Sequence, residues 1–276
     1  MSPSILVSTT PAGVTTITIT RPHRRNAVNP STARDLYDAF IDFEQDPAQK
    51  VAILTGADGA FCAGADLVDL TTQNQGNPAS SDPRDRNQNH LQPVHGRNCG
   101  PMGPSRLQVR KPVIAAVAGH AVAGGLELSL LADMRVAEED AVFGVYCRRW
   151  GVPLIDGGTV RLQAIVGLGR ALDMILTGRP VPAQEALSIG LANRVVPKGK
   201  ALEEANKIAE QLLKFPNACM NVDRNSCYYA AYNASSFEDA MQHEFEQGIQ
   251  VLEKESFQGA ARFAGGLGRH GGFEKL

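Results

Sequence analysis

Hydrophobic and polar residues alternate near the N-terminus, at 4–8 and 14–20, which is the period of half-buried β-strands. The turn-forming residues 10–13 (TPAG) separate the two stretches and predict a hairpin. Further along the chain, short runs rich in apolar residues predict four more strands, at 51–56, 112–119, 134–137 and 141–144.

Residues 29–46 follow a helical period instead. Leu36, Phe40 and Phe43 fall on one face of the predicted helix, and Asn29 with Pro30 forms a typical helix start. A helix placed between two strand-like stretches is the repeating unit of an α/β fold, and this alternation continues to about residue 197.

Helical spacing of apolar residues returns at 201–215 and 236–255, without intervening strands. The pattern therefore predicts an α/β core of ββα units over 1–200 and a helical C-terminal region over 201–276. The interval 71–105 is rich in Asn, Gln, Pro, Gly and Ser and has almost no apolar period. It predicts a mobile insertion, either a lid over a site or a solvated loop.

The composition of the chain argues against several classes of function. The chain has 276 residues and a net charge of −2, which favours neither a nucleic-acid partner nor an acidic membrane surface. No stretch approaches the roughly 20 apolar residues that span a bilayer, and no signal or transit peptide is expected. The five cysteines form no CxxC pair, which is typical of a reducing compartment such as the cytoplasm.

Two glycine-bearing turns follow predicted strands: GAFCAGADL at 59–67 and GHAVAGGLEL at 119–128. Each is a strand–turn–helix site where small residues let a ligand approach the backbone. Helix starts carry unpaired N–H groups, and two such groups aimed at one point form an oxyanion hole. Serine-hydrolase and phosphate-loop motifs are absent, and the six histidines include no HxxxH pair, so no metal is expected.

Glu127 follows the glycines of the second turn and stands among leucines. A carboxylate held in an apolar place near a site has a raised pKa, which suits proton transfer near neutral pH. The alternative from spacing alone is a solvated glutamate on an exposed helix face.

Five segments together resemble the enoyl-CoA hydratase/isomerase superfamily, the crotonases. They are TRPHRRNAVN, GAFCAGADL, GHAVAGGLEL, FGVYCRRWGVPLIDGGTVRL and ALDMILTGRPVPAQEALSIGLANRVVP. The resemblance runs from about residue 4 to 265, with 71–105 outside it. It implies an α/β crotonase fold, a spiral of ββα units whose C-terminal helical region builds homotrimers or dimers of trimers.

The resemblance also implies the site. The backbone N–H groups of Ala65 and Gly124 would hold the thioester oxygen of an acyl-CoA as it becomes an enolate, and Glu127 matches the first catalytic glutamate. Contacts with CoA or substrate are implied for Arg24, Arg25, Ala27, Ala63, Asp66, Leu67 and Cys147. No cofactor is implied beyond the coenzyme A of the substrate.

The chain departs from the hydratases at the second glutamate, where it has Cys147. A thiol does not replace a carboxylate in activating water. Asp156 lies close to where some isomerases of the superfamily carry an acidic residue, and we expect it to reach the site. Its alternative role is to cap the helix that begins just after it. Arg148 and Arg149 either pair with these carboxylates or are exposed.

The sequence thus predicts an acyl-CoA enzyme that hydrates 2-enoyl-CoA to 3-hydroxyacyl-CoA. A double-bond isomerase is the first alternative, because it needs one good carboxylate. CoA-ester hydrolysis also stays open, because a fold does not fix a function. The last alternative is a non-catalytic homologue that binds CoA esters, which the loss of the second glutamate would favour.

Overall fold

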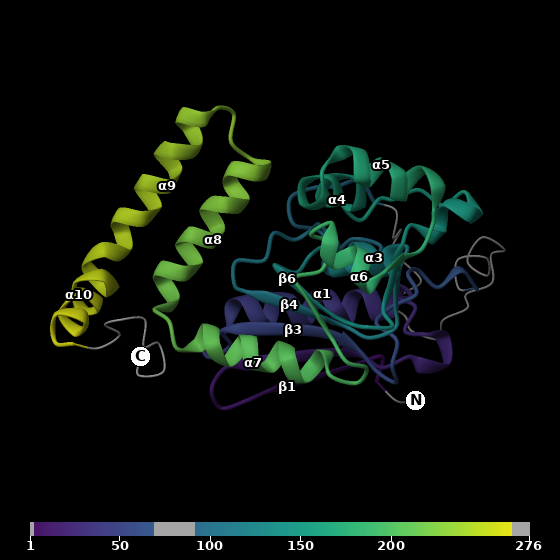
Figure 1. Ribbon diagram of the computed structural model, residues 1–276, viewed down its shortest axis with the longest axis horizontal. Coiled ribbons are helices and arrows are strands. Elements are labelled where there is room, and N and C mark those ends of the chain that lie inside the picture. Colours follow the sequence, from purple (N-terminus) through teal and green to yellow (C-terminus); the bar gives the residue numbers. More distant parts are fainter. Residues whose placement is uncertain (1–2, 69–91, 267–276) are drawn as a thin grey trace. The chain divides into compact units, whose positions relative to one another are not determined.

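The computed structural model describes residues 3–68 and 92–266, and the statements that follow concern this part of the chain (Figure 1). Contacts divide the chain into two compact units, Met1–Ala209 and Glu210–Leu276. The division falls slightly after the expected boundary at residue 200, because the first turns of the helix that begins at Ala201 pack into the first unit: Ala201, Ala205, Ile208 and Ala209 are buried.

The first unit is organised around a six-stranded sheet with strand order β1-β2-β3-β4-β6-β9. The predicted hairpin is confirmed, since β1 and β2 pair antiparallel, and every other neighbouring pair is parallel. Parallel strands covered on both faces are uniformly apolar, as the fully buried residues of β4 illustrate. The strands are β1 (Ile5–Thr9), β2 (Val14–Ile19), β3 (Val51–Gly56), β4 (Val113–Val117), β6 (Met134–Glu138) and β9 (Arg194–Val196).

A second sheet of three short strands has the order β5-β7-β8. The strands are β5 (His120–Val122), β7 (Val142–Gly144) and β8 (Val181–Pro182). β5 pairs parallel with β7, and β7 pairs antiparallel with β8. Because β5 follows β4 almost directly, the chain leaves the large sheet and enters the small one at Gly119, whose φ is +55°.

Helix α1 (Pro30–Gln45) confirms the prediction for this segment. The Asn29 side chain accepts a hydrogen bond from the Thr32 N–H at 3.0 Å, so it caps the helix as expected. Leu36, Phe40 and Phe43 are fully buried on the face that packs against the core. The remaining helices of this unit are α3 (Gly124–Ser129), α4 (Gly158–Val166), α5 (Leu168–Thr177), α6 (Ala183–Ser188) and α7 (Ala201–Leu213), with 3₁₀ turns at η1 (Pro22–Arg24), η3 (Pro104–Arg106) and η4 (Tyr146–Trp150).

The expected insertion at 71–105 divides into two parts. Residues 71–91 lie outside the described residues. Toward its C-terminal end the segment packs into the first unit, with Met102, Pro104 and Ser105 buried. Arg97 donates to both carboxylate oxygens of Glu44, at 2.7 and 2.8 Å. This end of the segment therefore differs from the mobile loop that its polar composition predicts, because three buried residues and one ion pair anchor it.

The second unit consists of α8 (Asn217–Tyr232), α9 (Phe237–Val251), the π-helical turn η5 (Leu252–Ser256) and α10 (Phe257–Ala264). Ser236 caps α9 through Asp239 N–H, at 3.1 Å. The Tyr229 ring stacks on His243 with centroids 3.8 Å apart, which joins α8 to α9. Glu255 accepts from the N–H groups of Ala218 and Cys219, so a carboxylate holds the start of α8.

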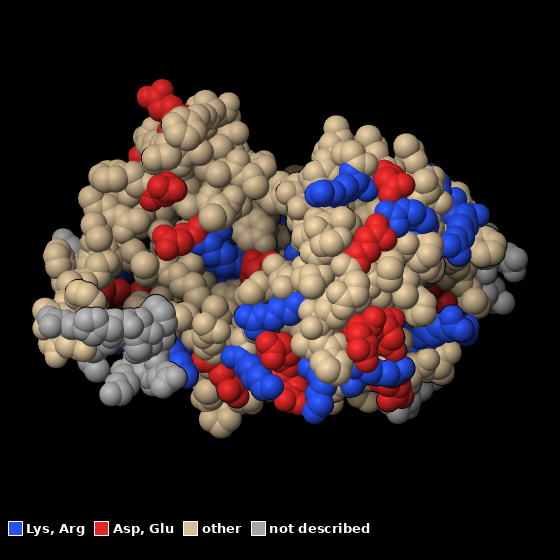
Figure 2. Space-filling model, viewed as in Figure 1, with Lys and Arg blue, Asp and Glu red and all other residues tan. Residues whose placement is uncertain are grey.

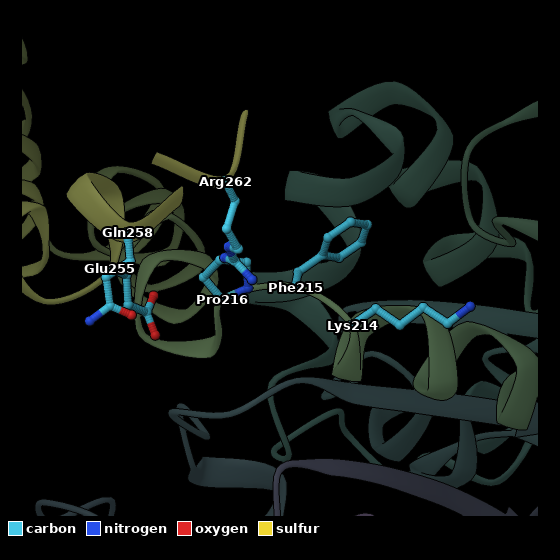
Figure 3. Close-up of a pocket in the computed structure, with 6 residues that line it drawn as sticks. All are labelled: Lys214, Phe215, Pro216, Glu255, Gln258 and Arg262. Atoms are coloured by element: carbon cyan, nitrogen blue, oxygen red, sulfur yellow. The ribbon is translucent and has the colours of Figure 1, made fainter. Parts of the chain in front are cut away.

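A pocket of about 370 Å³ lies within this second unit. Figure 3 shows its lining residues, which come from the α7–α8 junction and from the last helical turns: Lys214, Phe215, Pro216, Glu255, Gln258 and Arg262. It contains none of the side chains that the sequence predicts to be catalytic.

Charged side chains of both signs are interspersed on the face shown in Figure 2. Several charged residues of the molecule form ion pairs: Arg179 bridges Asp173 and Glu185, and Lys207 pairs with Glu203. Within the described ranges, no helix combines the length and the apolar character that a membrane crossing requires.

Candidate active site

Glu127 lies on α3, directly after the sharp turn that leaves β5. The turn places Ala123 at φ +52°, a conformation that costs a non-glycine residue about 1–3 kcal/mol. A Cβ on Gly125 would overlap the Cys62 carbonyl oxygen. Glycine is required here because α3 packs its first turn directly against the backbone of the segment that follows β3.

The Glu127 carboxylate is buried, with 3% of the residue exposed. Its Oε1 accepts hydrogen bonds from the Asp156 N–H at 3.0 Å and the Gly158 N–H at 2.8 Å. A Cβ on Gly158 would lie 2.9 Å from Oε1, so a glycine is needed there too. With Oε1 committed to these two donors, Oε2 is the oxygen left for a substrate or water.

Burial is the main reason that the pKa of Glu127 rises from 4.5 to about 7, and the nearby charge of Asp156 adds to the shift. The two backbone donors and the Arg161 guanidinium act in the opposite direction. The alternative of a solvated surface glutamate is therefore wrong. A carboxyl group with a pKa near 7 can both give and take a proton at neutral pH.

The segment that carries Ala65 runs between two other pieces of backbone. On one side, Val28 donates to the Gly64 carbonyl at 2.8 Å and accepts from the Asp66 N–H at 2.9 Å. In this parallel bridge the N–H of Ala65 points away from Val28. On the other side, Cys62 pairs with β5, which brings the segment beside the start of α3.

The Gly124 N–H opens α3 and so has no acceptor within the helix. A Cβ on Gly64 would lie 3.0 Å from this nitrogen, so the glycine next to Ala65 is in contact with it. Among the described residues, neither the Ala65 nor the Gly124 N–H donates a hydrogen bond to another group. The two predicted donors thus lie on adjacent segments, and both lack a protein acceptor in the described part of the chain, as the donors of an oxyanion hole must.

Asp156 is the second buried carboxylate of this region, with 3% of the residue exposed. Its Oδ1 accepts from the Met102 N–H at 3.0 Å and from the Ser105 hydroxyl. Burial raises the pKa of Asp156 above its ordinary value of 3.8, and these two donors offset only part of that rise. The alternative role as a helix cap is wrong, because α4 is preceded by Gly157 at φ +92° and has no side-chain cap. That turn directs the Asp156 side chain toward residues 102–105.

Cys147, in η4, is buried. Burial and the charge of Glu127 both raise the pKa of its thiol, so it is neutral near pH 7. Arg148 and Arg149 are exposed and donate to the carbonyls of Ile175 and Gly178 rather than to either carboxylate. Glu127 therefore faces a neutral thiol, and neither carboxylate is hydrogen-bonded to a guanidinium from this turn.

The residues expected to contact CoA differ in accessibility. Arg24 and Arg25 are exposed, and Leu67 is 40% exposed. Ala27 is buried and Ala63 half-buried. The Asp66 carboxylate is buried and pairs with Arg21 at 3.0 Å, an ion pair that joins two segments.

Three groups of the site were missed by sequence reasoning: the Ser105 hydroxyl, the Met102 N–H and the Arg161 guanidinium. Arg161 donates to the carbonyls of Ser105 and Leu107, at 2.6 and 2.9 Å. These contacts join segments about 50 residues apart, and no local pattern signals them. In the described ranges, no group of three or more His, Cys, Asp and Glu residues could hold a metal ion.

Two backbone donors that have no acceptor among the described residues thus lie on adjacent segments, one of them on the helix that carries a buried carboxylate of raised pKa, and such groups suit reactions that pass through an enolate-like anion. The family model for enoyl-CoA hydratase/isomerase matches residues 9–264. The chain therefore belongs to the enoyl-CoA hydratase/isomerase family, as the sequence segments predict, and its fold is the crotonase fold.

Individual relatives agree with this assignment. The chain is 36% identical over 203 residues to enoyl-CoA hydratase EchA19 of Mycobacterium tuberculosis, covering 71% of this chain and 70% of that protein. It is 35% identical over 205 residues to a short-chain-enoyl-CoA hydratase of Clostridium acetobutylicum, covering 72% of each. Among solved structures, enoyl-CoA hydratase EchA1 of Mycobacterium marinum matches with a TM-score of 0.83 and 30% identity, over 95% of this chain and 96% of that one.

Proposed function

We propose that the protein hydrates 2-enoyl-CoA thioesters to 3-hydroxyacyl-CoA. The observation that carries the proposal is Glu127, a buried carboxyl with a pKa of about 7 and one committed oxygen, on the helix whose first N–H is unpaired. Relatives that bear the names enoyl-CoA hydratase and crotonyl-CoA hydratase support the same reaction.

In this reaction the N–H groups of Ala65 and Gly124 bind the thioester oxygen and stabilise the negative charge that develops on it. Such a donor contributes roughly 3–4 kcal/mol in other enzymes. The oxygen of water bonds to C3 as one carboxyl group takes a proton from it, and C2 receives a proton from the other. Glu127 and Asp156 are the two carboxyl groups. The double bond between C2 and C3 becomes a single bond.

We propose the substrate contacts on the same basis. Arg24 and Arg25 suit the phosphates of CoA because they are exposed guanidinium groups. Ala27, Ala63, Leu67 and Cys147 lie on the segments that flank the site, and we propose that they line it. No cofactor other than the CoA of the substrate enters the proposed steps.

Isomerisation of the double bond is the second candidate, and Cys147 is the observation that favours it. A neutral thiol stands where a hydratase has its second glutamate, and moving one proton between carbons needs only one efficient carboxyl group. The two reactions differ in whether water enters the product.

The test is turnover of trans-2-, cis-3- and dienoyl-CoA thioesters, followed by the absorbance of the conjugated enoyl thioester and by product mass. We expect addition of water to trans-2-enoyl-CoA, with kcat lowered about 10²–10⁴-fold in Glu127→Gln. Glu210→Gln, at an exposed glutamate of α7, is the matched control and should retain activity. Migration of the double bond without addition of water would assign the protein to the isomerases, and tight binding of CoA esters without turnover would overturn both candidates.

Assembly into a homotrimer or a dimer of trimers is also proposed, from the surface of α9. Phe237, Met241, Phe245 and Ile249 recur every fourth residue and are all exposed. This spacing puts them on one face of the helix. An apolar stripe of this kind marks an interaction surface, and we propose a second copy of the chain as its occupant.

A cytoplasmic location is proposed from the cysteines. All five, including the exposed Cys227, are free thiols. This pattern is typical of a reducing compartment.

A further inference from the structure

We propose that Ser105 is a positioning residue that holds Asp156 in its ionised form, ready to accept a proton from the attacking water. The inference rests on the proposed function for the reaction, but its structural basis is separate. It assigns a role to a hydroxyl in the segment that sequence reasoning treats as a solvated insertion.

The Asp156 carboxyl group is contacted by hydrogen-bond donors. Its Oδ1 accepts from the Ser105 hydroxyl and, at 3.0 Å, from the Met102 N–H. A backbone N–H can only donate, so this oxygen must act as an acceptor, and two donors on one oxygen favour the carboxylate over the carboxylic acid. Ser105 is 1% exposed, so water does not replace its hydroxyl readily.

Contacts with Arg161 and with Gly100 hold the Ser105 hydroxyl in place. Arg161, on α4, donates to the Ser105 carbonyl at 2.6 Å and to the Leu107 carbonyl at 2.9 Å. A Cβ on Gly100 would overlap the Ser105 hydroxyl and lie 2.9 Å from Asp156 Oδ1, so the backbone packs closely over this hydrogen bond. A free surface loop would not need such an arrangement.

Several ionisable groups face the two carboxylates. Arg106 and Arg161 stabilise the negative charge of Asp156. Asp156 in turn raises the pKa of Glu127 and of Cys99. Glu127 also faces Arg161, and its charge raises the pKa of the Cys147 thiol.

The two carboxyl groups are therefore coupled. Loss of the Ser105 hydroxyl makes Asp156 easier to protonate. The acid limb of the bell-shaped pH profile of kcat, which reports protonation of Asp156, therefore moves to higher pH. The alkaline limb stays, because Glu127 loses its proton beside an Asp156 that is already charged, and the profile narrows from the acid side.

The experiment compares wild type, Ser105→Ala and Ser105→Thr. Ser105→Ala should lower kcat at least tenfold with KM changed less than about twofold, as loss of a hydrogen bond to a charged group implies. Its pH profile should be narrower than that of wild type. Ser105→Thr keeps a hydroxyl and should restore most of kcat and the width of the profile.

Thr55→Val is the matched control, because it removes a buried hydroxyl that donates to the Ala116 carbonyl between β3 and β4 at 2.9 Å. It should leave the width of the profile unchanged. An equal loss of activity in Ser105→Ala and Ser105→Thr, or a profile of unchanged width in Ser105→Ala, would overturn the inference.

A second readout separates this inference from the proposed function. Titration of carboxyl ¹³C signals, with Asp156 assigned by Asp156→Asn, follows its pKa without turnover. We expect that pKa to rise in Ser105→Ala. If wild type fails to turn over any thioester but the pKa still rises, only the proposed reaction is wrong. If wild type hydrates its substrate and the pKa does not move, only the role of Ser105 is wrong.

Discussion

The two units of the molecule differ in how far their apolar residues are buried. All the buried hydrophobic residues of the described chain lie in Met1–Ala209, including the fully buried Phe40, Phe61 and Phe143. In the described part of Glu210–Leu276, Ser226 is the only buried residue, whereas Phe237 is 83% exposed and Phe245 is 68% exposed. The first unit supplies its own core, while the second has helices without one.

The difference explains why the first unit suits the proposed chemistry. Holding two carboxylates out of water costs free energy, and only a well-packed core with directed N–H donors offsets that cost. Glu127 is held by two N–H donors, and Asp156 by one N–H and one hydroxyl donor. The described part of the second unit has no comparable interior, because none of its apolar residues is buried.

The largest expected effect tests the core of the first unit. Phe40→Ala deletes a fully buried ring from α1, and such a change costs about 3–5 kcal/mol through lost burial and the cavity left behind. Denaturant unfolding at pH 7 should show this loss as a lower midpoint with an unchanged slope. A loss below 1 kcal/mol would mean that α1 is not part of one packed core.

A somewhat smaller effect measures the cost of burying Glu127. Its pKa is about 7 in the folded protein against an ordinary 4.5, so the folded state binds the proton more tightly than the unfolded state. The neutral carboxyl is favoured at low pH, and this stability is lost as the pH rises from 4.5 through 7. Relative to Glu127→Gln, wild type should lose about 3 kcal/mol across that window.

The measurement is the free energy of unfolding of wild type and Glu127→Gln at several pH values between 4.5 and 7.5. Subtracting one curve from the other removes the contributions of the other titrating groups to first order. Glu210→Gln, which changes an exposed glutamate, should track wild type. Parallel curves for wild type and Glu127→Gln would contradict a raised pKa for this carboxyl.

Much of the first unit could be predicted from the sequence because its elements are long and periodic. The helix at 30–45 shows its apolar face and its cap, and the buried strands show as short apolar runs. The strands β5, β8 and β9 escaped prediction because two or three residues carry no period. Helix α8 lies in the region predicted to be helical, but its bounds were not predicted because its apolar residues do not follow a clear helical stripe.

The site was predictable only in part. Glu127 stands out as a carboxylate among leucines after two glycines, and its buried position agrees with the expectation. Asp156 could be proposed from the family segment but not distinguished from a helix cap, because both roles suit an aspartate before two glycines. The contact with Ser105 spans 51 residues, and such a contact depends on the folded path of the chain rather than on any local pattern.

The smallest effect on folding, and the sharpest test of the contrast between the units, comes from Phe245. If the α9 stripe has no partner within one chain, Phe245→Ser should change the stability of the isolated monomer by less than about 0.5 kcal/mol, as is usual for an exposed side chain. In sedimentation, wild type should run as an assembled species and Phe245→Ser as a monomer. Glu244→Ser, at an exposed polar neighbour, should leave sedimentation unchanged.

Because binding of copies stabilises the folded state by mass action, the midpoint of thermal unfolding should depend on protein concentration in wild type and not in Phe245→Ser. A loss of several kcal/mol at every concentration would instead mean that the second unit has a core of its own, and the contrast between the two units would fail.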